Sequence, residues 1–148
     1  PETLHNRLGI AIGQKAYKAY LDLINSPRWQ RALNFGARPQ RLLWASTGSK
    51  DPNASDVLYI TSLASPFTVN TMPEQTLKAF ADHGDLGDAL PADGGDSETL
   101  LNDFTQAGVD NQALAARLQE EGAESFVKSW NELMEVITTK SESLVQAD

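Results

Sequence analysis

Apolar side chains recur along the start of the chain at the spacing of an amphipathic helix. They fall three or four positions apart and therefore share one stripe: Leu4, Leu8, Ile12, Ala16, Tyr20, Leu23 and Ile24. Gly9 and Gly13 lie four positions apart in the same segment and permit close approach of a neighbouring element. Ser26 and Pro27 then predict the N-cap and first turn of a short second helix that ends at Gly36.

Two short runs predict the strands of a parallel sheet. Residues 42–45 (Leu-Leu-Trp-Ala) are apolar without alternation, which indicates a strand buried on both faces, and residues 66–71 predict a second strand. The two strands are separated by residues 46–65. This segment of 20 residues is longer than the roughly ten to twelve residues that a parallel crossover connection requires. We therefore expect a crossover helix over residues 56–64, although their composition also suits a strand. With a further helix over 73–84, the order predicts a parallel α/β sheet or barrel.

The last third of the chain is predicted to be helical. An exposed loop over residues 85–95 leads to a helix capped by Asp96 or Ser97. Another helix begins after Asp110 and is expected to be interrupted at Gly122. A final long helix follows, and we expect its polar end beyond residue 140 to be frayed. Its apolar stripe consists of Phe126, Trp130, Leu133, Met134 and Ile137.

Two strands of this kind cannot form a complete sheet. Parallel strands leave open edges, and strands buried on both faces need more helices than this chain predicts. We therefore expect the chain to hold one part of a larger sheet, with the remaining strands in another segment.

Composition narrows the possible chemistry by exclusion. The 148 residues include no cysteine and only two histidines, which excludes disulfides, cysteine metal sites and thiol catalysis and argues against a histidine-rich metal site. No apolar run has the roughly 20 residues of a membrane span, and no signal-peptide pattern is present. A cytoplasmic protein that does not bind membranes is the expectation.

Charge is distributed unevenly along the chain. Residues 1–50 carry eight basic and two acidic side chains, whereas residues 51–148 carry four basic and 18 acidic ones, for a net charge of −8. The acidic total argues against general nucleic-acid binding, which needs a sustained basic face. The basic segment suits either a small anion or a solvated helix surface.

The polar loop after the first strand is the strongest candidate for chemistry. In parallel α/β folds, functional groups project from the carboxyl ends of strands. Residues 46–50 (Ser-Thr-Gly-Ser-Lys) supply three hydroxyls, a glycine and an ammonium, which together can hold a phosphate. The segment lacks the spacing of a nucleotide P-loop, and an ordinary polar loop with a solvated Lys50 is the alternative.

For three other polar features, a structural interpretation is weighed against a functional one. Asn70, at the end of the second strand, either faces a substrate or acts with Thr71 as a turn and cap ahead of Pro73. His83 is interpreted as a helix-end residue rather than a base. The acidic side chains of residues 85–96 lack the order of a calcium loop and are interpreted as solvated.

Several segments resemble bacterial transaldolases, in particular the long subgroup found alone or fused to glucose-6-phosphate isomerase. Residues 38–52 (Arg-Pro-Gln-Arg-Leu-Leu-Trp-Ala-Ser-Thr-Gly-Ser-Lys-Asp-Pro) resemble the seventh strand of that family and the loop after it. Residues 56–60, 68–74 and 79–84 resemble the next helix, the eighth strand and the final barrel helix. Residues 120–130 resemble the C-terminal helices, so the resemblance covers nearly the whole chain.

This resemblance implies a fold class and a division of the chain. The fold would be α/β, the C-terminal part of a (β/α)₈ TIM barrel with strands seven and eight and the terminal helices. Residues 1–95 would form the barrel segment, and residues 96–148 would pack on the barrel as helices. The implied partner is the N-terminal part of the same barrel.

The resemblance also implies a reaction of the pentose phosphate pathway. Transaldolases move a dihydroxyacetone unit between sugar phosphates through a lysine Schiff base, and the lysine imine makes a cofactor or metal unnecessary. The reactive lysine and its acidic partners precede the matched segment, so no catalytic residue is assigned to this chain, which alone is expected to be inactive. Lys50 looks too exposed to be that lysine. Ser46 matches a phosphate-binding serine, Lys50 lies near a phosphate-binding arginine of other branches, and Asn70 is a possible substrate contact.

Two other functions remain open. Much of the segment 96–145 is predicted to be amphipathic helix, which also suits a non-catalytic helical interaction domain. A different phosphate-binding barrel, such as an aldolase, would use the same loop chemistry.

Overall fold

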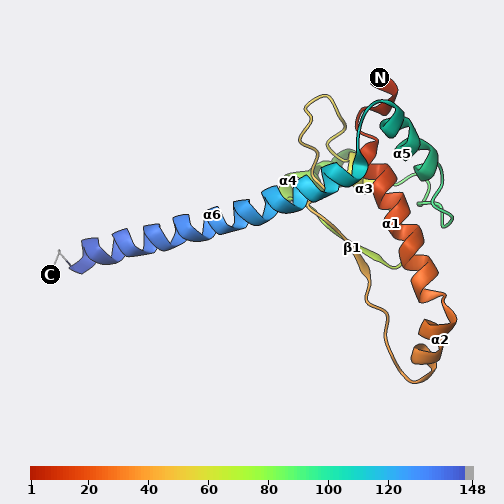
Figure 1. Cartoon of the computed structure of the whole chain (residues 1–148), viewed down its shortest axis with the longest axis horizontal. Helices are drawn as coiled ribbons and strands as arrows, with labels where there is room; N and C mark the ends of the chain where they lie inside the picture. Colours follow the sequence, from red (N-terminus) through yellow and green to blue (C-terminus); the bar gives the residue numbers. More distant parts are fainter. Residues whose placement is uncertain (146–148) are drawn as a thin grey trace. The chain divides into compact units, whose positions relative to one another are not determined.

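The computed structural model describes residues 1–145 (Figure 1). The chain forms two compact units, one over Pro1–Ala107 and the other from Gly108 onward. The first unit holds all the elements except the last helix: η1 (Glu2–Leu4), α1 (Leu8–Ile24), α2 (Pro27–Asn34), β1 (Leu42–Ala45), α3 (Leu58–Ser62), β2 (Thr68–Thr71), α4 (Glu74–His83) and α5 (Ser97–Gln106). The second unit contains α6 (Asn111–Val145).

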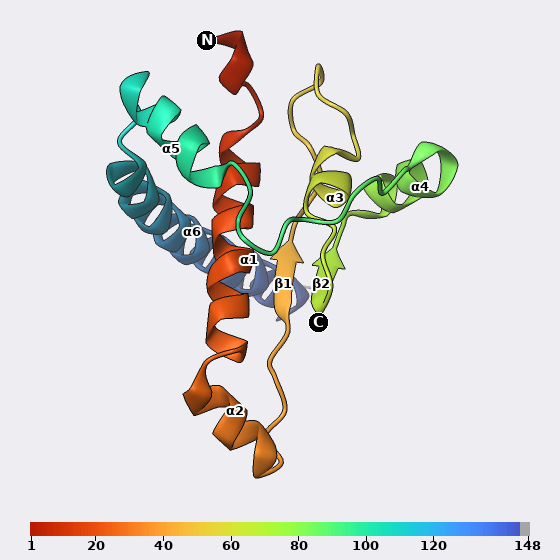
Figure 2. The same cartoon turned by 90° about the vertical axis from the view of Figure 1, so that its right-hand side faces the viewer.

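The strands β1 and β2 are parallel neighbours, and α3 lies between them in sequence (Figure 2). Their register pairs Leu42 with Thr68 and Ala45 with Thr71, so both carboxyl ends reach the same edge of the sheet. The predicted order of strand, crossover helix and strand is therefore confirmed. Within residues 1–145 these are the only strands, which is consistent with part of a barrel.

The prediction that β1 is buried on both faces is wrong for this chain by itself. Leu42 and Trp44 pack against the helices, but Leu43 is 48% exposed and Ala45 is exposed as well. Successive side chains of a strand point to opposite faces, and the described part of the chain provides helices for only one of them. The apolar sequence of β1 thus indicates a face that needs a cover from elsewhere.

One cluster of the core of the first unit lies between α1 and the end of α3. Tyr17, Leu63 and Leu90 are buried together, with Trp44 and Tyr59 packed around them. The two glycines of α1 allow this approach, as the sequence predicted. A Cβ on Gly13 would lie 2.5 Å from Cδ2 of Leu63, and one on Gly9 would lie 3.2 Å from the ring of Tyr59.

The predicted stripe of α1 is only partly correct. Leu4, in η1, is buried, but Ile12 is 48% exposed and Leu23 is exposed too. The buried positions within α1 are Ala11, Gly13 and Tyr17. The close contact at the glycines turns this face toward α3 and leaves the expected stripe partly in solvent.

Helix α2 begins as predicted. The Ser26 hydroxyl accepts a hydrogen bond from the Trp29 N–H at 3.2 Å, and Pro27 occupies the first turn. The helix ends at Asn34, and Gly36 follows with a φ of +92°, a conformation that favours glycine.

The helices α4 and α5 confirm the elements predicted at 73–84 and after residue 96. Helix α5 buries Leu100, Leu101 and Phe104 and packs against α1. Asp96 occupies the N-cap position without capping the helix through its side chain. Its carboxylate instead binds the Arg7 guanidinium at 2.9 Å, which ties the start of α5 to the segment before α1.

The interruption predicted at Gly122 is wrong, because α6 is continuous (Figure 1). The Asp110 carboxylate accepts the N–H groups of Gln112 and Ala113 at 2.9 and 3.0 Å, so the predicted cap is confirmed. One glycine costs a helix only about 1 kcal/mol relative to alanine, which cannot break so long a helix. The end expected to fray remains helical to residue 145, and the rest of that prediction falls on residues 146–148, outside the described residues.

Residues 1–145 contain no candidate membrane span or metal site. None of the helices there is long and apolar enough to cross a bilayer. Nor does any group of three or more His, Asp or Glu side chains in residues 1–145 have an arrangement suited to a metal ion.

Candidate functional site

The candidate loop begins with a strained residue. Ser46 directly follows β1 and has a φ of +56°, in the left-handed region that side chains other than glycine and asparagine rarely adopt. Such a conformation costs about 1–3 kcal/mol and persists only where surrounding contacts enforce it. The Ser46 side chain is exposed, so packing of this side chain in the core does not explain its left-handed conformation.

Thr47 supplies the contacts that hold this turn. Its side chain is buried, with 5% of the residue exposed, and its hydroxyl donates to Asn70 Oδ1 at 2.6 Å. Its N–H donates to the Thr71 carbonyl at 3.5 Å, which continues the ladder beyond β1. The loop after β1 is therefore bound to the end of β2, and Ser46 and Asn70 come to the same edge of the sheet.

The sequence interpretation missed Thr47. A threonine within a serine-rich turn carries no special signal in the sequence, since loops of this composition are common. Its position two residues after Ala45, opposite the end of a paired strand, is the feature that marks it, and this feature needs the strand register.

The middle of the loop lies against the start of α4. A Cβ on Gly48 would lie 3.1 Å from Cγ of Pro73 and 3.3 Å from Oγ1 of Thr76, which is buried. The N-terminus of a helix carries a partial positive charge and unpaired N–H groups, which favour anions. Glu74 in the first turn of α4 is ion-paired with Lys78 at 2.6 Å.

A second side-chain hydrogen bond holds the far end of the loop. Asn6 Nδ2 donates to Asp51 Oδ2 at 2.8 Å, and the Asn53 N–H donates to Asp51 Oδ1 at 2.9 Å. The hydrogen bond from Asn6 makes the larger contribution and the one from Asn53 the smaller. Together they lower the pKa of Asp51 and keep its carboxylate ionised. The adjacent Lys50 is exposed and forms no ion pair with any residue in 1–145.

A shallow pocket of about 210 Å³ opens beside Ser46. It lies between the end of β1 and α3 and is lined by Trp44, Ala45, Ser46, Thr47, Tyr59 and Leu63. Neither Lys50 nor Asn70 lines it. Of the three predicted site residues, the structure thus places Ser46 on the pocket wall, links Asn70 to the loop through Thr47, and leaves Lys50 on the exposed part of the loop.

His83 is the last residue of α4, as the sequence predicted. Its Nε2 lies 3.0 Å from Asp56 Oδ1 and its Nδ1 lies 3.3 Å from Asp82 Oδ2. Hydrogen bonds to Asp56 and then Asp82 raise the pKa of His83, and the bond to His83 lowers the pKa of Asp56. This pair joins the end of α4 to the residues before α3 and takes no part in the loop.

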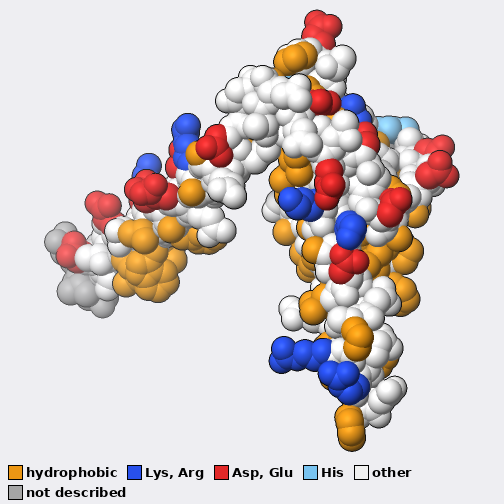
Figure 3. Space-filling view, turned by 45° about the vertical axis from the view of Figure 1, so that its right-hand side comes forward, with side chains coloured by type: hydrophobic (Ala, Val, Ile, Leu, Met, Phe, Trp, Pro, Cys, Tyr) orange, Lys and Arg blue, Asp and Glu red, His pale blue; other side chains and the backbone are white. Residues whose placement is uncertain are grey.

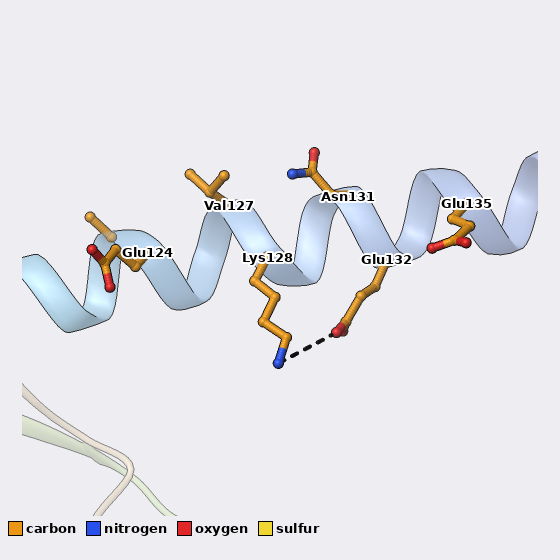
Figure 4. A pocket seen from close by; sticks show the side chains of 7 residues that line it. Glu124, Val127, Lys128, Asn131, Glu132 and Glu135 are labelled. Carbon is orange, nitrogen blue, oxygen red and sulfur yellow. Dashed lines mark ion pairs between the residues drawn. The ribbon is translucent and has the colours of Figure 1, made fainter.

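A larger hollow of about 540 Å³ lies on α6 (Figure 4). All its lining residues come from this one helix, including Val127 and the ion pair between Lys128 and Glu132 at 3.8 Å. It is therefore a face of an amphipathic helix and not an enclosed cavity. Figure 3 shows hydrophobic side chains gathered along the same helix, and Phe126, Trp130 and Leu133 are among its exposed residues.

Comparison with known proteins identifies the family. Residues 2–137 match the family described as transaldolase/fructose-6-phosphate aldolase. The chain belongs to this family. It is similar to proteins named transaldolase, with 45% identity over 137 residues to that of Parafrankia sp. (strain EAN1pec), 46% over 134 residues to that of Mycolicibacterium paratuberculosis, and 44% over 133 residues to that of Thermobifida fusca.

These alignments cover most of this chain but only part of each relative. They include 92% of the chain for the Parafrankia transaldolase and 89% for the other two, yet 37%, 36% and 36% of the relatives themselves. The chain thus spans little more than a third of the length of these transaldolases and corresponds to their C-terminal portion. The resemblance inferred from residues 38–52 is confirmed at the level of the family.

Proposed function

We propose that this chain supplies the phosphate-binding side of a transaldolase, which transfers a dihydroxyacetone unit between sugar phosphates through a lysine Schiff base. The observation that carries the proposal is the loop at residues 46–51. In a chain of the transaldolase family, it follows a parallel strand, is bonded to the end of the next strand and lies against a helix start. Loops after the seventh and eighth strands with a helix N-terminus are a recurrent phosphate site in barrel enzymes.

The same proposal assigns β1 and β2 as strands seven and eight of a (β/α)₈ barrel. Residues 1–95 then form the barrel segment, and residues 96–148 provide helices that pack on the barrel. The N-terminal part of the barrel would pair with the open edge of the sheet and cover the exposed face at Leu43. The assembled enzyme is expected to act in the pentose phosphate pathway in the cytoplasm.

Three residues receive roles in substrate binding. Ser46 binds the substrate phosphate through its hydroxyl and Lys50 through its ammonium. Asn70 contacts the sugar chain through its amide nitrogen, because Thr47 already occupies its amide oxygen. Binding energy from a phosphate remote from the reacting carbonyl orients that carbonyl for attack.

The covalent step is assigned to a lysine outside this chain. A lysine must be deprotonated to form a Schiff base, which requires a partly desolvated site or nearby positive charge. Lys50 is exposed and therefore lacks the desolvated surroundings that this chemistry requires. The imine itself accepts electrons from the substrate, so the proposed reaction needs neither a metal nor an organic cofactor.

Complementation tests this proposal. The chain is combined with the separately expressed N-terminal part of the Parafrankia transaldolase, here called the two-chain assembly. We expect turnover of fructose 6-phosphate with erythrose 4-phosphate in the assembly and none in either part alone. Turnover by the isolated chain, or an inactive assembly in which both parts are shown to associate, would contradict the proposal.

A binding domain without a catalytic role is the second candidate, because α6 exposes a continuous apolar face. The double substitution Ser46→Ala with Lys50→Ala separates the two functions. If the loop binds phosphate, KM for fructose 6-phosphate in the two-chain assembly rises about tenfold or more, since each charge-assisted hydrogen bond contributes about 1.5–3 kcal/mol. An unchanged KM favours the binding domain.

The family description also includes fructose-6-phosphate aldolase, so simple cleavage is the third candidate. Product analysis with erythrose 4-phosphate as acceptor distinguishes transfer from cleavage. A transaldolase forms a seven-carbon ketose phosphate, whereas an aldolase releases free dihydroxyacetone.

A further inference from the structure

The proposed phosphate loop is fixed at both ends by a side-chain hydrogen bond. The Thr47 hydroxyl donates to Asn70 Oδ1 at 2.6 Å, next to Ser46. The Asn6 amide donates to Asp51 Oδ2 at 2.8 Å, next to Lys50. Each proposed phosphate ligand therefore stands beside a residue that is bonded to another element, β2 in one case and the segment before α1 in the other.

The first bond stabilises the strained turn at Ser46. Thr47 is buried, and both its hydroxyl and its N–H donate to the end of β2. A residue fixed in this way leaves its predecessor little rotational freedom, which fits the left-handed φ of Ser46. Without the hydroxyl, Ser46 can relax toward the β region, and its own hydroxyl then points elsewhere.

The second bond keeps the carboxylate of Asp51 occupied. Its two oxygens accept from Asn6 and from the Asn53 N–H, while the neighbouring Lys50 has no ion pair within residues 1–145. Asn6 has a φ of +60°, a left-handed conformation that asparagine tolerates better than most residues. A released Asp51 carboxylate would be free to neutralise the adjacent ammonium.

We propose that Thr47 and Asn6 are positioning residues that hold Ser46 and Lys50 in the geometry that binds the substrate phosphate. The inference rests on the proposed function, because it assigns the phosphate to these two side chains. Neither Thr47 nor Asn6 needs to touch the substrate. Their contribution is to reduce the ordering that the loop must undergo when phosphate binds.

Thr47→Val in the two-chain assembly tests the first bond. Valine keeps the shape of threonine and removes only the hydroxyl, and Thr47→Ser is the matched control that keeps the hydroxyl. The readouts are kcat, KM for fructose 6-phosphate and the inhibition constant of inorganic phosphate. We expect Thr47→Val to weaken phosphate inhibition and raise KM about threefold to tenfold, as loss of one hydrogen bond implies. Thr47→Ser should retain most of the affinity.

Asn6→Gly tests the second bond in the same assay. Glycine adopts the φ of Asn6 without strain, so the substitution removes the amide and leaves the backbone conformation accessible. We expect a smaller loss of phosphate affinity than for Thr47→Val, because the Asn6 bond is exposed whereas the Thr47 bond is partly buried. The combination Asn6→Gly with Asp51→Asn should recover part of the loss, since it removes the released charge beside Lys50.

The outcomes separate this inference from the function on which it rests. A merely structural defect lowers the amount of active enzyme and leaves the inhibition constant of phosphate unchanged. If the unsubstituted assembly is inhibited competitively by phosphate and Thr47→Val shows the same constant, the inference is wrong while the function stands. If the unsubstituted assembly, with both parts shown to associate, has no turnover or no phosphate inhibition, the proposed function fails, and the positioning roles fail with it.

Discussion

The carboxyl end of the small sheet and the helix α6 are stabilised in opposite ways. The loop at residues 46–51 is fixed by contacts from three directions, which come from β2, from the start of α4 and from Asn6. The described interactions of α6 are local, such as the Asp110 cap and the ion pair between Arg117 and Glu121 at 2.6 Å. The loop is therefore held by tertiary contacts within this chain. Helix α6, in contrast, has an apolar face that is exposed to solvent.

This difference shows that the loop at residues 46–51 is held by contacts within this chain, whereas the apolar faces are not covered by it. The hydrogen bonds of the loop at residues 46–51 join segments that are distant in the sequence but all lie within Pro1–Ala107. Apolar faces, in contrast, need large surfaces of another element to cover them. The exposed Leu43 and the stripe of α6 are the surfaces that the proposed barrel would bury.

Two phenylalanines give the largest expected contrast between the regions. Phe104 in α5 is 9% exposed, whereas Phe126 in α6 is 81% exposed. We expect Phe104→Ala to lower the free energy of unfolding by about 3–5 kcal/mol and Phe126→Ala to change it by less than about 0.5 kcal/mol. Urea unfolding of the chain followed by circular dichroism measures both. Equal losses would mean that α6 is packed as tightly as α5, and the contrast would disappear.

A glycine in α6 provides an intermediate effect. A Cβ on Gly122 would meet no other atom, so alanine fits there without a clash. Because α6 depends on local helix stability, we expect Gly122→Ala to stabilise it by about 0.5–1 kcal/mol. The thermal melt of the helical signal should shift upward. Amide exchange of α1 and α5 serves as the control and should not change, because those helices lie in the other unit.

The smallest expected effect belongs to the pair of His83 and Asp56. The pKa of His83 is raised above its usual 6.5, mainly by Asp56 and then by Asp82. A group whose folded pKa is raised stabilises the fold fully below its unfolded pKa, and this stabilisation is lost as the pH rises through the folded pKa. Asp56, with a lowered pKa, stabilises above its unfolded pKa, so the pair acts in mildly acidic solution.

NMR titration of the His83 ring measures this pair directly. We expect Asp56→Asn to lower the pKa of His83 and Asp82→Asn to lower it less, in line with the order of their contributions. Both partners are about half exposed, so solvent screens the pair and the change in overall stability should be small. If the pKa of His83 is the same in both variants as in the unsubstituted chain, the pair does not form in solution.

Much of the fold could be predicted from the sequence because the signals were local. Ser26-Pro27 marked the start of α2, Asp110 marked the start of α6, and the length of the segment between the strands required a helix. Gly122 misled the prediction because a single glycine in a long helix costs little. The face of α1 was misplaced because the glycines at 9 and 13, and not the large apolar side chains, set its contact with α3.

The candidate site was also predicted only where the signal is local in the sequence. The residue types and their order placed Ser46 and Lys50 on a loop after a strand. The family resemblance then implied that these two residues bind the substrate phosphate. Thr47 and Asn6 were missed because their partners are distant in the sequence, 23 and 45 residues away. Such partners follow from strand register and helix packing, which the hydrophobic pattern does not specify.

The position of the covalent adduct tests the central claim most directly. The two-chain assembly is incubated with fructose 6-phosphate, reduced with borohydride to trap the Schiff base, and each polypeptide is weighed by mass spectrometry. The adduct is predicted on the N-terminal polypeptide, with this chain unmodified in the assembly and alone. An adduct on this chain, at Lys50 or any other lysine, would contradict the account.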